Sequence, residues 1–148
     1  MTGAWSRDVG IDVVAIREWG AKAVVCLMEA FELKMLAVEH LPTVVVSEGI
    51  RWFHLPIRDA SVPSAAFEQE WAVKGAELRK ILSGGGRVLV HCKGGLGRSG
   101  IIAARLLVEF GMKPEAAIAL VRKQRPGAIE NATQEKYVRS LSSLKVAQ

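Results

Sequence analysis

Residues 90–100 read VHCKGGLGRSG, in which a short apolar run ends at Cys92 and a loop leads into Arg98 and the next predicted helix. The backbone of this loop can turn tightly enough for successive N–H groups to point at one centre, because three of its residues are glycine: Gly94, Gly95 and Gly97. The helix predicted to begin at Ser99 adds its positive N-terminal end. The segment therefore predicts a binding site for an anion such as phosphate.

Three side chains of this segment can take part in a reaction at a bound phosphate group. The positive end of the helix favours the thiolate of Cys92, which is the nucleophilic form of cysteine. Arg98 can hold two phosphate oxygens with its planar guanidinium group, and Ser99 can donate a hydrogen bond to the sulfur. A cysteine on an apolar strand is more often a packing residue, and a glycine-rich turn before a helix is common. The combination is the informative feature, and it matches neither a nucleotide-binding P-loop nor a dinucleotide-binding fingerprint.

Outward from this loop, hydrophobic periodicity predicts helices and strands that alternate along the chain. We expect strands over 22–28, 51–55 and 87–91, and helices over 11–19, 32–41, 65–83, 99–110, 114–123 and 131–144. Residues 42–49 are ambiguous, because they are β-branched in composition but carry a proline at a plausible first helical position. The pattern predicts an α/β fold with a central, mostly parallel sheet flanked by helices. Residues 88–90 suit the centre of that sheet, and the loops after residues 55 and 91 should lie at the same edge.

Of the 148 residues, 50% are hydrophobic and 24% are charged, which predicts one globular domain over residues 1–148. No apolar run reaches the roughly 20 residues of a spanning helix, and the N-terminus lacks a signal-peptide pattern, so we expect a soluble, cytoplasmic protein. Two cysteines are too few for a disulfide framework or a four-thiolate zinc site. The net charge of +5 favours anionic partners and by itself leaves small phosphate esters, phosphoproteins and nucleic acid open.

The segment HCKGGLGRSG resembles the HCxxGxxR[ST] signature of cysteine-dependent phosphatases. Its GLGRS core is most similar to the small dual-specificity branch, which contains the cyclin-dependent-kinase-associated and Cdc14-like phosphatases. The resemblance continues through residues 23–28, residues 56–63 and the segment RPGAIENATQEKYV at 125–138. It implies a dual-specificity-phosphatase fold. Because the chain starts later than many relatives, we also expect one or two N-terminal edge strands to be missing or replaced by residues 1–8.

The resemblance also implies a mechanism in which Cys92 attacks phosphorus and a second loop supplies a general acid. Asp59 is the expected acid, because it lies in LPIRDASVP, in the loop that carries the acid in family members. The alternative is that Asp59 only caps a turn. The expected catalytic residues are Cys92, Arg98, Asp59 and Ser99, and the expected phosphate-binding residues are Lys93, Gly94, Gly95, Leu96, Gly97 and Arg98. No metal ion or other cofactor is implied.

Three further residues have two interpretations each. His91 is half of the family's HC pair and is expected to fix the loop backbone, although it could equally be a core residue. Gln134 has the spacing of a capping box with Asn131, whereas in several branches of the family a glutamine in this loop positions the hydrolytic water. Cys26 resembles the strand cysteine that forms a disulfide with the oxidised catalytic cysteine in the phosphoinositide-phosphatase branch, which would make it a redox partner of Cys92, but a buried packing cysteine is the commoner case.

Basic side chains at Arg58, Lys93 and Arg125 are expected to raise the positive potential at the pocket mouth, unless they are only solvated charges. The residues and the resemblance together predict a metal-independent phosphomonoester hydrolase, of dual specificity for phosphotyrosine and phosphoserine or phosphothreonine. We expect a monomer that acts on a phosphoprotein or another phosphate ester, with no nucleic-acid or membrane partner.

Other functions are compatible with part of this pattern. A phosphoinositide or small-molecule phosphatase would share the mechanism, and Lys93 matches one of the two lysines in the phosphoinositide-phosphatase loop. A catalytically silent phosphate-binding module would keep the anion site, but none of Cys92, Arg98 and Asp59 has been lost. Sulfur-transfer and arsenate-reducing enzymes need no general-acid loop, and rhodanese-type loops lack the GxxRS ending.

Overall fold

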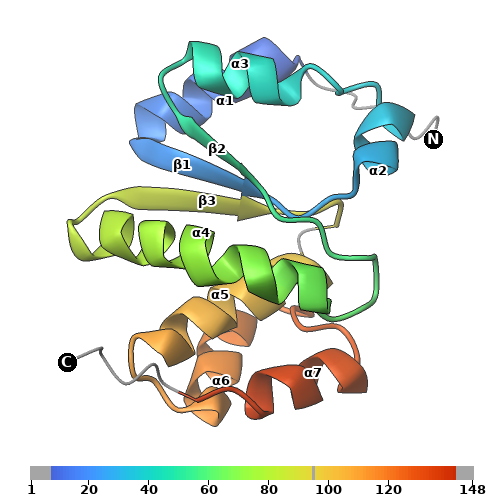
Figure 1. Ribbon diagram of the computed structural model, residues 1–148, viewed down its shortest axis with the longest axis vertical. Coiled ribbons are helices and arrows are strands. Elements are labelled where there is room, and N and C mark those ends of the chain that lie inside the picture. Colours follow the sequence, from blue (N-terminus) through green and yellow to red (C-terminus); the bar gives the residue numbers. More distant parts are fainter. Residues whose placement is uncertain (1–7, 95, 143–148) are drawn as a thin grey trace. The chain divides into compact units, whose positions relative to one another are not determined.

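The computed structural model describes residues 8–94 and 96–142 (Figure 1). Helices and strands alternate over most of this range, as the sequence pattern predicts. In chain order the elements are α1 (Val9–Trp19), β1 (Ala21–Cys26), α2 (Ala30–Met35), α3 (Leu41–Ser47), β2 (Arg51–His54), α4 (Ala65–Ser83), β3 (Arg87–His91), α5 (Gly97–Glu109), α6 (Pro114–Gln124) and α7 (Ala132–Arg139). No helix in the described ranges is long and apolar enough to cross a membrane.

The chain forms two compact units. Unit 1 contains the residues up to Pro56 together with Ser64–His91, and therefore β1, β2 and β3. Unit 2 contains Ile57–Pro63 together with the residues from Cys92 onward. The short segment Ile57–Pro63, here called the acid loop because it contains Asp59, thus belongs with the C-terminal helices although unit 1 flanks it in the sequence.

The sheet of unit 1 is parallel, with the strand order β2-β1-β3. Val24 of β1 lies opposite Trp52 of β2 on one side and Leu89 of β3 on the other. The expectation that residues 88–90 lie at the centre of the sheet is therefore wrong. β1 is central and buried on almost its whole length. Among the described residues β3 pairs with β1 alone, and its apolar residues are only partly buried.

Helices cover both faces of this sheet within unit 1, with α1 and α3 on one face and α4 on the other (Figure 1). The core between the sheet and α1 and α3 is apolar and includes Val13, Val24, Val45 and Ile50. Burial of these side chains removes them from water and provides the main favourable contribution to folding. The predicted α/β class with a parallel sheet flanked by helices is confirmed.

Local hydrogen bonds and a glycine fix the ends of α1 and the start of α4. The Asp8 carboxylate accepts a hydrogen bond of 2.9 Å from the Ile11 N–H, and α1 ends at Gly20, which has a left-handed φ of 100°. The Ser64 hydroxyl accepts a bond of 3.2 Å from the Phe67 N–H at the start of α4. Such local contacts are readable from sequence because donor and acceptor are only a few residues apart.

The predicted helix over 32–41 differs from the structure. α2 ends at Met35, and Ala37 has a left-handed φ of 58°, which an α-helix does not accommodate. The ambiguous residues 42–49 fall mainly in α3, where Pro42 occupies the first turn, the position at which a missing N–H costs least. Similarly, α5 begins at Gly97 rather than Ser99. α7 ends at Arg139, and the last two residues of the predicted helix, 143 and 144, lie outside the described residues.

Unit 2 contains the helices α5, α6 and α7 together with the acid loop. Helix α5 contacts both α6 and α7. A polar cluster joins α5 to α7. Arg105 donates a hydrogen bond of 2.9 Å to Glu109 within α5 and one of 2.6 Å to the Tyr137 hydroxyl on α7. Both charged side chains of the pair are almost fully buried, so their mutual bond offsets the cost of removing them from water.

Candidate active site

The acid loop and the loop that begins at Cys92 meet at the side chain of Arg98. The guanidinium Nη1 donates a hydrogen bond of 3.0 Å to the Ile57 carbonyl, and Nη2 lies 3.5 Å from Asp59 Oδ1. Arg98 is only 1% exposed, whereas the Asp59 side chain is 68% exposed. The buried arginine therefore holds the base of the acid loop, while the carboxyl group next to it remains accessible to a substrate.

Cys92 and Ser99 lie at opposite ends of the loop but touch each other. The Ser99 hydroxyl donates a hydrogen bond of 3.0 Å to Cys92 Sγ. Cys92 is partly exposed and follows β3 directly, and Ser99 is in the first turn of α5. A hydroxyl donor at this distance stabilises negative charge on sulfur.

The N-terminus of α5 faces this loop without a side-chain cap. Leu96 is the N-cap residue and makes no side-chain hydrogen bond to the helix. The first N–H groups of an α-helix have no partner within the helix, so an anion can accept from them. Lys93 and Gly94 are exposed on the same loop and Leu96 is partly buried, while Gly95 lies outside the described residues.

Gly97 has a structural reason that the sequence did not indicate. Neither Gly94 nor Gly97 has a left-handed φ. A Cβ at Gly97 would overlap the Glu130 carboxylate and come within 2.9 Å of Gln134 Oε1, whereas a Cβ at Gly94 would meet no atom within 4 Å. Gly97 is thus required by the close approach of the Glu130 and Gln134 side chains.

Gln134 connects the acid loop to the segment before α7. Its side chain is fully buried. Nε2 donates a hydrogen bond of 3.0 Å to the Ser61 carbonyl, and Oε1 accepts one of 3.1 Å from the Glu130 N–H. Asn131 caps α7 by accepting from the Gln134 N–H, as the capping-box spacing predicts, but the return bond comes from Glu130 instead of Asn131. Both atoms of the Gln134 amide therefore have protein partners in this structure.

Two side chains of unit 2 hold backbone carbonyl groups in a way that the sequence did not indicate. Besides capping α7, the Asn131 side chain donates a hydrogen bond of 3.0 Å to the Ala60 carbonyl. Arg122 on α6 donates to the carbonyls of Ala128 and Ile129, at 3.0 and 2.9 Å. The capping position of Asn131 was visible as a pattern, but nothing in the sequence indicated the distant carbonyl groups.

The basic residues expected at the pocket mouth have different surroundings. Arg125 donates a hydrogen bond of 3.2 Å to the Gly94 carbonyl, so it contacts the loop that begins at Cys92. Arg58 and Lys93 are exposed. All three side chains lie in unit 2 together with Arg98 and Asp59.

His91 and Cys26 lie in unit 1. His91 ends β3 opposite Cys26 of β1, and its ring centroid is 6.3 Å from that of Trp52. The Cys26 side chain is fully buried and belongs to the same core as Val24 and Met28. These surroundings are those of packing residues. The supporting role of His91 and the redox pairing of Cys26 with Cys92 stay predictions.

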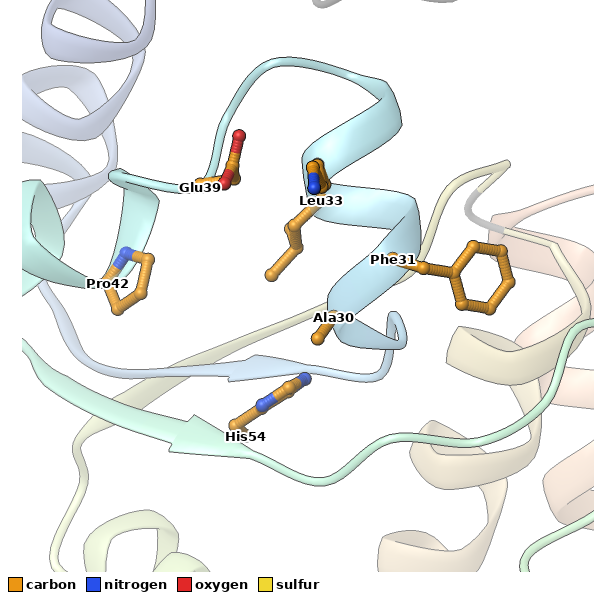
Figure 2. Close-up of a pocket in the computed structure, with 7 residues that line it drawn as sticks. Ala30, Phe31, Leu33, Glu39, Pro42 and His54 are labelled. Carbon is orange, nitrogen blue, oxygen red and sulfur yellow. The ribbon is translucent and has the colours of Figure 1, made fainter.

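Unit 1 also contains an open hollow of about 420 Å³ beside the ring of His54 (Figure 2). His54 lies at the end of β2, and its Nε2 is 2.6 Å from the Met28 carbonyl. Apolar residues of α2 and Pro42 of α3 form most of the wall, and the lining residues are Ala30, Phe31, Leu33, Lys34, Glu39, Pro42 and His54. None of the expected site residues lines this hollow.

Residues 4–138 match a family model described as PTP-SAK: Swiss Army Knife protein, DSP-PTPase phosphatase domain. The chain belongs to this family of cysteine-dependent phosphatases. Protein tyrosine phosphatase type IVA 3 of Homo sapiens is 32% identical over 123 residues, which are 83% of this chain and 65% of that protein. Cyclin-dependent kinase inhibitor 3 of Rattus norvegicus is 31% identical over 135 residues, 89% of this chain and 62% of that protein. The chain thus spans slightly less than two thirds of these relatives.

Solved structures of phosphatases share the fold. A kinase-associated phosphatase, crystallised with its catalytic-site cysteine replaced by serine, has a TM-score of 0.81 at 30% identity, over 93% of this chain and 80% of that chain. Tk-PTP in its active form has a TM-score of 0.73 at 28% identity, over 88% of this chain and 85% of that chain. The resemblance to small dual-specificity phosphatases is therefore confirmed, and the family acts on phosphorylated substrates such as proteins.

Proposed function

We propose that this domain hydrolyses phosphate monoesters through a phosphocysteine on Cys92, with Asp59 as general acid and base and with no metal ion. The observation that carries the proposal is the hydrogen bond of 3.0 Å from Ser99 Oγ to Cys92 Sγ. It directs a donor at the sulfur beside the uncapped N-terminus of α5. A thiolate and a phosphate group are both stabilised by that combination of donors.

In the first step, the Cys92 thiolate attacks phosphorus and forms the S–P bond, while the bond between phosphorus and the leaving oxygen breaks. Asp59 gives its proton to the leaving oxygen, so the product departs as a neutral alcohol or phenol. Arg98 and the N–H groups at the start of α5 stabilise the charge on the phosphoryl oxygens. This requires the Arg98 guanidinium, now bonded to Ile57 and next to Asp59, to share its N–H groups with the substrate.

In the second step, water attacks phosphorus and transfers a proton to the Asp59 carboxylate. The S–P bond breaks, inorganic phosphate is formed, and the sulfur leaves as the thiolate that Ser99 stabilises with its hydrogen bond. Gln134 supplies a structural contribution in this scheme, because its amide atoms are bonded to Ser61 and Glu130. A role in holding the attacking water would require one of these bonds to open.

The proposed substrates are phosphoproteins that carry phosphotyrosine or phosphoserine and phosphothreonine. The sequence contains no phosphotyrosine-recognition loop that would build a deep pocket, so a shallow site should admit both short and long phosphorylated side chains. Arg58, Lys93 and Arg125 favour acidic sequences around the phosphate. Phosphoinositides are the second candidate class, which Lys93 on the loop supports. We further propose that residues 1–148 act as one catalytic domain, which is supported by a family match that includes residues of both units.

The decisive experiment measures hydrolysis of 4-nitrophenyl phosphate with EDTA present. We expect turnover by the wild-type protein and none by Cys92→Ser, which should still bind inorganic phosphate. Cys26→Ser is the matched control, because it changes the buried cysteine of unit 1 and should keep turnover. Wild-type activity in Cys92→Ser would exclude the mechanism.

A panel of phosphopeptides and phosphoinositides then defines the substrate class. We expect comparable kcat/KM for phosphotyrosine and phosphoserine or phosphothreonine peptides, and lower values for phosphoinositides. A preference for phosphotyrosine above about 10³-fold, roughly 4 kcal/mol in transition-state binding, would contradict the shallow site. A preference of the same size for phosphoinositides would show that phosphoinositides, and not phosphoproteins, are the substrate class.

A further inference from the structure

Within unit 2, a side chain that the hydrolytic steps do not use connects the acid loop to the start of α7. Asn131 is the N-cap of α7, and its Oδ1 accepts a hydrogen bond of 2.8 Å from the Gln134 N–H. Its Nδ2 donates a second bond of 3.0 Å to the carbonyl of Ala60, the residue after Asp59. One amide group therefore fixes both the start of α7 and the middle of the acid loop.

Ala60 adopts a backbone conformation that needs such support. Its φ is +59°, in the left-handed region that is unfavourable for a residue with a Cβ. A residue stays in that region only when its surroundings determine its conformation. The Ala60 N–H donates a bond of 2.9 Å to Asp59 Oδ1, so the direction of the Asp59 carboxyl group depends on the Ala60 backbone.

The support for this conformation comes from an anchored helix end. The buried Gln134 side chain donates to the Ser61 carbonyl at 3.0 Å, next to the bond from Asn131 to Ala60. Further along α7, Glu135 accepts a bond of 2.7 Å from Arg122, and Tyr137 accepts one of 2.6 Å from Arg105. The first turn of α7 is therefore a fixed base to which the acid loop is attached.

We propose that Asn131 is a positioning residue for the general acid. By holding the Ala60 carbonyl, it keeps Ala60 in its left-handed conformation and so keeps the Asp59 carboxyl group directed at the leaving oxygen. The inference rests on the proposed function. Asn131 touches no reacting atom, and it acts through Ala60 and Asp59.

The test separates the bond to Ala60 from the cap of α7. Asn131→Ser keeps an N-cap of similar strength, because serine and asparagine cap helices about equally well, but it has no amide group to reach Ala60. We expect kcat to fall about 10-fold for an alkyl phosphate and much less for 4-nitrophenyl phosphate, because a good leaving group needs little protonation. KM should be unchanged for both substrates.

Two more variants complete the comparison. Asn131→Asp keeps the shape and the acceptor but not the donor, so it should show the same selective loss even if the serine variant fails to fold. Asp8→Ser makes a cap exchange at α1 in unit 1 and should leave both rates unchanged. In an Asp59→Ala background, Asn131→Ser should have no further effect, because the two residues act in one chain of contacts.

Amide hydrogen exchange gives a readout that does not need activity. The amides of Ala60 and Ser61 should exchange several-fold faster in Asn131→Ser than in wild type and remain at the wild-type rate in Asp8→Ser. Equal losses on both substrates, additivity with Asp59→Ala, or unchanged exchange would each overturn the role of Asn131. By contrast, a wild-type protein that does not hydrolyse 4-nitrophenyl phosphate would overturn the proposed function itself.

Discussion

The core of unit 1 consists of apolar side chains, whereas the loops of unit 2 are held by polar side chains that donate to backbone carbonyl groups. In unit 1, buried residues such as Val13 and Ile50 pack together, and two of the ion pairs, Arg17–Glu48 and Arg51–Glu77, are at the surface. In unit 2, loop carbonyls accept from the side chains of Arg98, Arg122, Arg125, Asn131 and Gln134.

Apolar contacts and hydrogen bonds contribute differently to stability and to the geometry of the loops. Apolar contacts have no preferred direction, so they contribute to the free energy of unfolding without fixing a particular atom. A hydrogen bond has a required distance and angle, so each one restricts where a loop carbonyl can lie. Substitutions in the apolar core of unit 1 should therefore change stability and leave kcat intact, whereas loss of a side chain that positions a catalytic group in unit 2 should change kcat.

The largest expected effect is on the core of unit 1. Ile50 is 3% exposed, and Ile50→Ala should lower the free energy of unfolding by about 2–5 kcal/mol, through lost burial and the cavity left behind. Urea unfolding monitored by circular dichroism measures this change. The ratio of kcat values for alkyl and aryl phosphates should stay at its wild-type value below the unfolding transition. A changed ratio would show that the core of unit 1 also affects the geometry of the catalytic groups.

The next largest effect concerns the acid. Asp59→Ala should lower kcat for an alkyl phosphate by roughly 10²-fold or more, and less for 4-nitrophenyl phosphate, because general-acid help increases with leaving-group basicity. Steady-state kinetics on both substrates measures the difference. The free energy of unfolding of the Asp59→Ala protein should change little, because the Asp59 side chain is 68% exposed. Equal losses on the two substrates would indicate a structural role for Asp59.

A substitution of Arg122 tests how much an arginine that takes no part in the reaction stabilises unit 2 through backbone carbonyl groups. It is partly exposed and donates to two carbonyls and to Glu135. Arg122→Gln should lower the free energy of unfolding by about 1–2 kcal/mol, after allowance for solvent at an exposed group. Thermal unfolding measures this change, and a variant as stable as wild type would show that these bonds are replaced by water without loss.

The same variant should change the titration of Glu135. The hydrogen bond from Arg122, together with the charges of Arg122 and Arg139, lowers the pKa of Glu135 below its ordinary value of 4.5. A lowered carboxyl pKa contributes stability above pH 4.5, and this contribution is lost as the pH falls through the folded-state pKa. In Arg122→Gln the pKa of Glu135 should rise toward 4.5, which carboxyl NMR titration can follow.

A smaller effect is expected at Ala60. Ala60→Gly should raise the free energy of unfolding by roughly 0.5–1 kcal/mol, because glycine adopts the left-handed conformation at no steric cost. Gly49 also has a left-handed φ, of 78°, and Gly49→Ala in unit 1 should show the opposite sign. Chemical denaturation of both variants measures the pair, and a destabilised Ala60→Gly would contradict the strain assigned to the acid loop.

The smallest effect belongs to a surface ion pair of unit 1. The Arg51 and Glu77 side chains are about half exposed and 3.1 Å apart, so Arg51→Gln should change the free energy of unfolding by less than about 1 kcal/mol. Unfolding at low and at high salt should give nearly the same difference from wild type. A loss comparable to that of Arg122→Gln would show that polar contacts of the two units contribute alike.

Much of the fold was predictable because its signals are local. Helix α1 begins at Val9, two residues before the predicted start at residue 11, and ends at the predicted residue, while α4 has the predicted bounds. The prediction over 32–41 was wrong because the apolar spacing continues past Met35, where the backbone turns at Ala37. Propensity alone does not decide whether a chain of suitable residues continues a helix or turns to pack on a sheet.

The candidate site divides in the same way. Cys92, Arg98, Ser99 and Asp59 could be chosen from the sequence because the loop pattern and the family resemblance identify them. The hydrogen bond that the Asn131 amide donates could not be predicted, because its acceptor is the carbonyl of Ala60, 71 positions away. Every residue carries a carbonyl group, so the sequence does not indicate which one a distant side chain will meet.

The sequence by itself determined the residue types that can attack, bind and protonate a phosphate ester, together with the alternation of helices and strands. Only the tertiary structure decided that the acid loop belongs with the C-terminal helices, that Gly97 is needed for the approach of Glu130 and Gln134, and that Asn131 holds Ala60. The physical reason is that caps and periodicity depend on neighbours within one or two helical turns, whereas loop positions depend on hydrogen bonds between segments that only the folded chain brings together.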